Sequence, residues 1–223
     1  MTNLVDISLT LDAGYRMHTP EGVKNVQLEF ETIKDYPGGA GQLVSAVHMR
    51  LHNGTHVDAP MHFVEGGPSI DQVPLSAFYG PGLMADLTHV GLNAPIAAED
   101  LENAFRGRRL EDQRIFLRTN WNDHFGEEGY EENSPYISVG AVDWLASQHP
   151  ALVSYDYSHG KDDPEAPRRY YAVRTFLESG IVTMGYVTRL ARIDAARPFT
   201  VCAFPLAFKG VESSPVRAVL VQE

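Results

Sequence analysis

The sequence predicts a single α/β domain of high β content over residues 1–223. Helical and strand patterns alternate along the whole chain, and no linker, repeat or low-complexity segment divides it. Of the 223 residues, 43% are hydrophobic and 21% are charged, which is the composition of an ordinary globular protein. The predicted strands outnumber the predicted helices, so a mixed sheet with high β content is the expected architecture.

Alternation of apolar and polar residues predicts strands in the first quarter of the chain. Residues 4–11 and 26–33 alternate, and a third strand begins at residue 43. In this third strand His48 and His52 share the polar face, because side chains on a strand repeat every two residues. We therefore expect His52 to emerge at a strand end.

Residues that are typical of helix starts and ends occur in the rest of the chain. Residues 97–109 carry acidic residues early and basic residues late, which suits the helix dipole, and two further helices stop at Pro150 and Gly180. The complete expectation is a short helix over 69–80, strands over 81–90, 112–121 and 151–158, helices over 97–109, 138–150 and 167–180, a strand after Gly180, and last strands within 197–210 and 214–223.

Charge and cysteine content exclude several classes of protein. The net charge is −11 and no Lys/Arg run is present, so a nucleic-acid binder is not expected, and an acidic surface disfavours anionic membranes. No apolar run reaches the roughly 18 residues of a membrane span, and the N-terminus has no signal-peptide pattern. Cys202 is the one cysteine, which fits a reducing compartment. A cytoplasmic protein is the expectation.

Residues 51–63, "LHNGTHVDAPMHF", hold three of the nine histidines. His52, His56 and Asp58 are spaced H-x3-H-x-D, and the intervening Gly54 together with the later proline opposes a helix. A turn at Gly54 followed by an extended segment would converge three donors and leave coordination positions open, as in catalytic metal sites. The alternative is a polar loop whose histidines only form hydrogen bonds.

Other histidines are candidates around this group. His62 follows Asp58 by four residues and is placed to act as a general acid or base. His18 and His48 lie close enough in the chain to be candidate substrate contacts.

The motif "HNGTHVDAPMHF" resembles the H-x-G-T-H-x-D-x-P-x-H signature of the cyclase-like metal-dependent hydrolases, which include kynurenine formamidase, isatin hydrolase and trans-dienelactone hydrolase-type enzymes, and it matches in full. The resemblance continues over nearly the whole chain, in the segments "LVDISLTL", "IFLRTNW", "SPYISVGAVDWLA" and "FPLAFKGVESSPVRAV".

The resemblance implies a swivelling β/β/α fold, assembled as a homodimer or homotetramer. It implies that His52, His56 and Asp58 bind one divalent metal ion, Zn²⁺ or Mn²⁺, and that His62 is the catalytic acid/base. The expected reaction is hydrolysis of a small-molecule amide, lactam, lactone or formamide by a metal-activated water.

The chain departs from the family's pattern at two positions of the downstream segment. In the family's downstream segment Val173 falls where a histidine is usual and Gly185 falls where a glutamate is usual, which argues against a second metal. This loss keeps open a metal-bound cyclase or dehydratase (lyase), or a ligand-binding descendant without turnover. His159 is a candidate substitute, although we expect it to be a solvated loop residue.

Overall fold

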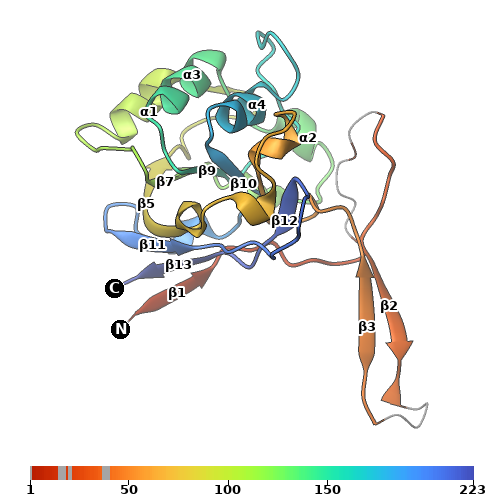
Figure 1. Cartoon of the computed structure of the whole chain (residues 1–223). Coiled ribbons are helices and arrows are strands. Elements are labelled where there is room, and N and C mark those ends of the chain that lie inside the picture. Colours follow the sequence, from red (N-terminus) through yellow and green to blue (C-terminus); the bar gives the residue numbers. More distant parts are fainter. Residues whose placement is uncertain (1, 15–18, 20–21, 37–40) are drawn as a thin grey trace.

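The computed structural model describes residues 2–14, 19, 22–36 and 41–223, and these residues form a nine-stranded, curled mixed sheet (Figure 1). In sheet order the strands are β1 (Asn3–Asp6), β13 (Val219–Gln222), β11 (Phe199–Cys202), β5 (Tyr79–Asp86), β7 (Arg114–Arg118), β9 (Leu152–Tyr155), β10 (Val182–Gly185), β4 (His56–Asp58) and β12 (Ser213–Pro215). The predicted mixed, β-rich architecture is confirmed.

Four neighbouring strands, β5, β7, β9 and β10, run parallel, and β4 and β12 extend this block in the antiparallel sense. Parallel neighbours need crossover connections. Three helices provide them, namely α1 (Ala98–Ala104), α3 (Val139–Ser147) and α4 (Tyr171–Glu178). The remaining short elements are α2 (Tyr130–Asn133), β6 (Pro95–Ile96) and β8 (Tyr136–Ile137).

The sheet is buried on both faces. On β7, Ile115 and Leu117 pack into the cluster formed with the helices, whereas Phe116 packs into a second cluster with residues of β11 and β13. All three side chains are fully buried. This explains why β7 reads as a continuous apolar run rather than an alternating one.

A two-stranded hairpin projects from the main body (Figure 1). It consists of β2 (Glu29–Lys34) and β3 (Val44–His48), paired antiparallel. Strand β2 starts later than predicted, and all of its residues are exposed, including Phe30 (54%) and Ile33 (62%).

Two local predictions were wrong. The segment 69–80 is not a helix but two 3₁₀ turns, Ile70–Gln72 and Leu75–Ala77, separated by Pro74, whose missing N–H prevents a continuous helix. The strand that begins near residue 43 ends at His48, so His52 lies in the following turn rather than on a strand. The helices over 97–109, 138–150 and 167–180 are present in shortened form.

No helix among the described residues is both long enough and apolar enough to cross a membrane. The treatment of residues 1–223 as one domain stays a prediction.

The loops at the ends of β7 and β9 are joined by the buried carboxylate of Asp156. It accepts hydrogen bonds from the backbone N–H and the hydroxyl of Thr119, both at 2.7 Å, and from the N–H of Asn120 at 2.9 Å. Burial raises the pKa of Asp156 to about 6, although these three donors act in the opposite direction. The pKa of this carboxyl in the folded state therefore lies above the ordinary aspartate value of 3.8.

Stability should depend on the ionisation of Asp156. A raised folded-state pKa gives a contribution that is fully present below the unfolded-state pKa and is lost as pH rises through about 6. Asp156→Asn, which stays neutral, should therefore gain about 2 kcal/mol of unfolding free energy relative to wild type between pH 4.5 and 7.5. Urea unfolding of both proteins at the two pH values measures this. If the difference in unfolding free energy between the two proteins is the same at both pH values, the pKa of Asp156 is not raised in the folded state.

Candidate metal centre

A tight turn brings His52 back toward β4. Gly54 has a φ of +67°, in the left-handed region that suits glycine, and the N–H of Asn53 bonds to the carbonyl of Arg50 at 3.2 Å. The chain then enters β4, which lies between β10 and β12 and is completely buried. Because side chains alternate along a strand, His56 and Asp58 point to the same side.

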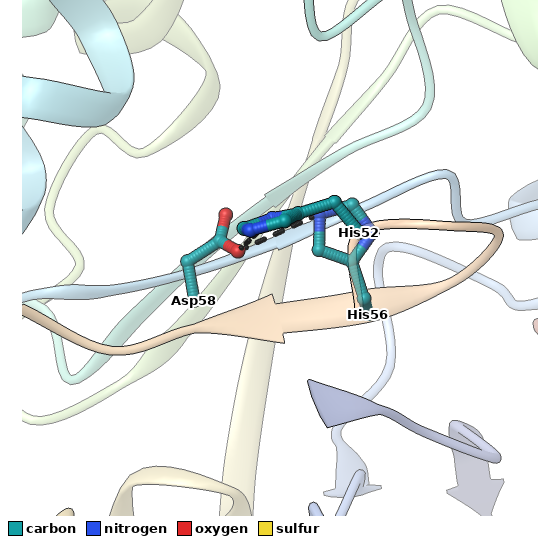
Figure 2. A group of neighbouring side chains, drawn as sticks. All are labelled: His52, His56 and Asp58. Carbon is teal, nitrogen blue, oxygen red and sulfur yellow. Dashed lines mark ion pairs between the residues drawn. The ribbon is translucent and has the colours of Figure 1, made fainter. Parts of the chain in front are cut away.

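The structure brings together the side chains of His52, His56 and Asp58 (Figure 2). One potential ligand atom from each lies within 4.8 Å of the others. Oδ1 of Asp58 is 2.9 Å from Nδ1 of His52 and 3.6 Å from Nε2 of His56. The predicted turn thus places two imidazoles and one carboxylate around a common point.

Each of these side chains is oriented through its other polar atom. Nε2 of His52 lies 3.0 Å from Oε1 of Glu212, and Nδ1 of His56 lies 2.7 Å from the carbonyl of Gly54. The hydroxyl of Thr183 donates to Oδ2 of Asp58 at 3.1 Å. These contacts leave Nδ1, Nε2 and Oδ1 directed at one another, which is the arrangement of metal ligands held by surrounding groups.

Burial and charge explain the ionisation of the cluster. Burial alone lowers the pKa of His52, but Asp58 and Glu212 outweigh it and raise the pKa to about 9. Burial lowers the pKa of His56 to about 4, although the negative charge of Asp58 acts to raise it. Burial would raise the pKa of Asp58, yet His56 and His52 hold it well below its usual range. The site is therefore built around a buried anion.

These residues fit a divalent metal ion. Oδ1 of Asp58 is buried and has no hydrogen bond of acceptable geometry among the described residues, although His52 is close. A buried carboxylate oxygen without a hydrogen bond is costly unless a cation approaches it. Two imidazole nitrogens and a carboxylate oxygen are donors that both zinc and manganese accept.

His62 lies at the edge of this cluster, in the 3₁₀ turn Pro60–His62. Its ring centroid is 4.4 Å from that of His52 and 4.2 Å from that of Phe63. Burial lowers the pKa of His62, with Asp58 opposing. Among the described residues its ring has no hydrogen-bond partner, so the imidazole is available to a bound molecule.

Of the two predicted substrate contacts, one lies away from the metal cluster and the other falls outside the residues that the structure describes. His48 is on the projecting hairpin, is exposed, and sits 3.3 Å from Glu31, apart from the metal cluster. His18 falls outside the described residues. A substrate-binding role for either stays a prediction.

Sequence reasoning missed several residues of the site. Thr183 and Glu212 come from β10 and from the segment before β12, far from the motif in sequence. His159 was expected in a solvated loop, and this was wrong. Its Nε2 is buried, and its ring lies 5.3 Å from that of His56. The family's closing segment contained Glu212, but no spacing rule links it to His52.

Comparisons with known proteins agree with the motif. The Cyclase family model matches residues 5–159. Kynurenine formamidase of Bordetella petrii is 28% identical over 178 residues, 79% of either chain. Isatin hydrolase A from Labrenzia aggregata superposes with a TM-score of 0.85 at 24% identity, covering 99% of this chain and 94% of that one. The Ralstonia solanacearum enzyme gives 0.87 at 20%, covering 100% and 92%. The predicted fold is confirmed.

Replacing the turn glycine should damage the cluster selectively. Gly54→Ala is expected to lower the unfolding free energy by about 1–2 kcal/mol, because an L-residue is strained at this φ. It should also weaken binding of a divalent cation by about tenfold or more, because the Gly54 carbonyl orients His56.

Gly66→Ala is the matched control. Gly66 has a φ of +73° and open space where a Cβ would lie, so Gly66→Ala reproduces the backbone strain and leaves the cluster untouched. It lacks the 2.4 Å approach of a Cβ at position 54 to Cδ2 of Leu11, which adds to the expected loss in Gly54→Ala. Urea unfolding and calorimetric titration with Zn²⁺ or Mn²⁺ compare the two variants. Equal cation affinities in both would contradict the importance of the turn.

Proposed function

The chain belongs to the Cyclase family, whose model matches residues 5–159, and from this premise we propose the substrate and the residue roles of a metal-dependent hydrolase. It is a hydrolase of small-molecule amides, acting on C–N bonds other than peptide bonds. The substrate class we propose is an aryl formamide or a cyclic amide, with lactones as related candidates. The names of two relatives, kynurenine formamidase and isatin hydrolase, support this class.

The single observation that carries the proposal is the converging group of His52, His56 and Asp58, each oriented by a second protein group. We assign these three residues as ligands of one divalent cation, zinc or manganese. Such a cation, when bound, polarises a carbonyl and lowers the pKa of a water molecule.

His62 is the proposed acid/base. Its ring stands beside His52 and Phe63, and burial lowers its pKa, which favours the neutral form. A neutral imidazole can accept a proton at one ring nitrogen and deliver it to the leaving nitrogen of the amide.

The proposal extends to assembly and location. A homodimer or homotetramer is supported by the projecting hairpin, where Phe30 and Val47 are cross-strand partners and are 54% and 52% exposed. Exposed apolar side chains gathered on one ribbon are typical of contact surfaces. A cytoplasmic location stays a prediction.

Removing the acid/base should separate chemistry from metal binding. His62→Ala is expected to keep the metal content of wild type and to lower turnover of N-formylaniline or isatin by about 100-fold, within the range of general acid–base catalysis. His124→Ala changes an exposed histidine paired with Glu127 and serves as the control. Elemental analysis and steady-state kinetics measure both properties.

Unchanged turnover in His62→Ala would remove this residue from the chemistry. If metal-loaded wild type opens or cleaves no amide or lactone, the lyase or ligand-binding alternative is favoured instead.

A further inference from the structure

His159 enters the metal centre from the loop after β9. Its Nδ1 lies 3.1 Å from the hydroxyl of Tyr155, and its ring stacks on Tyr186 with an interplanar angle of 11° and a centroid separation of 5.3 Å. Its ring centroid is also 5.3 Å from that of His56. Two tyrosine side chains therefore hold this imidazole beside His56, one of the proposed ligands.

Gly185 makes room for this ring. It is the residue of β10 directly opposite His56 in the antiparallel pairing with β4. A Cβ atom at position 185 would lie 1.3 Å from Nε2 of His159 and 2.0 Å from its Cδ2. The backbone of Gly185 does not adopt a positive φ, so the requirement for glycine here is one of space. The imidazole of His159 occupies the volume that a side chain at 185 would fill.

The second ring nitrogen of His159, Nε2, is buried without a hydrogen-bond partner in the part of the chain that the structure describes. A buried polar atom without a hydrogen bond is unfavourable, so an occupant that satisfies it is expected. His52, His56 and Asp58 share this pattern, since each has one polar atom held by the protein and one directed at the cluster. For His159 the holding group is Tyr155.

We propose that Nε2 of His159 is a fourth protein ligand of the cation bound by His52, His56 and Asp58. Its imidazole occupies the space beside His56 that a side chain at position 185 would otherwise fill. His159 is not among the three residues whose ligand atoms already lie within 4.8 Å of one another. The ring of His159 would therefore have to approach the cluster to contact a bound cation. This inference rests on the proposed metal site and adds a ligand from a loop outside the motif.

A fourth protein ligand has a consequence for the choice of metal. Four protein ligands complete a tetrahedral zinc site, whereas a six-coordinate metal such as manganese keeps positions for substrate. The cation that supports turnover should therefore be one that accepts more than four ligands.

The test is cation binding by metal-free full-length protein, titrated with Mn²⁺ and with Co²⁺. His159→Ala should weaken affinity for both by about tenfold or more and should change the intensity of the Co²⁺ absorption bands, which report the coordination number. Gly185→Ala keeps His159 but collides with its ring, so it should weaken affinity in the same direction. His89→Ala removes an exposed histidine paired with Asp100 and should match wild type.

Thermal unfolding of the metal-free proteins checks that the variants fold, and His159→Gln provides a second variant of similar polarity. Affinity and a Co²⁺ spectrum equal to wild type in both His159 variants would overturn the inference while leaving the three-residue site intact. A wild-type protein that binds neither cation would overturn the proposed metal site and this inference with it.

Discussion

The buried carboxylate of Asp58 is the constraint around which the site is organised. A carboxylate removed from water is unfavourable unless it is paired and hydrogen-bonded. Asp58 is 2% exposed, and it is held by the hydroxyl of Thr183 on one oxygen and approached by His52 and His56 on the other. The raised pKa of His52 and the depressed pKa of Asp58 are two results of this single arrangement. A divalent cation bound at this cluster would take the place of the His52 proton as the partner of the carboxylate.

The fold supplies rigidity where this constraint acts. Strand β4 is bonded on both sides, to β10 and to β12, and all three of its residues are buried. Thr183 stands directly opposite Asp58, and Gly185 stands directly opposite His56. The same pairing therefore delivers a hydrogen-bond donor to the carboxylate and leaves space for His159 beside the imidazole. The chemistry of the site depends on the register of one pair of strands.

Residues of the site that are close together in the sequence were predicted, whereas residues that the fold brings in from distant segments were missed. His52, His56 and Asp58 lie within seven residues, so turn chemistry and strand alternation were sufficient to predict their convergence. Glu212 and His159 reach the cluster only through sheet pairing across the chain, which no local period encodes. The segment 69–80 failed because Pro74 outweighs its apolar spacing, and the hairpin strand β2 alternates without being buried by this chain. Alternation thus predicted the strand but did not show whether its apolar side chains are buried.

The cluster of His52, His56 and Asp58 is proposed to bind one metal ion. Elemental analysis of protein purified without chelator, beside a His52→Ala, Asp58→Ala double variant, tests it most directly. About one zinc or manganese per wild-type chain is expected, and this metal should be lost in the double variant. Absence of metal from wild type even after reconstitution, or equal metal content in both proteins, would contradict it.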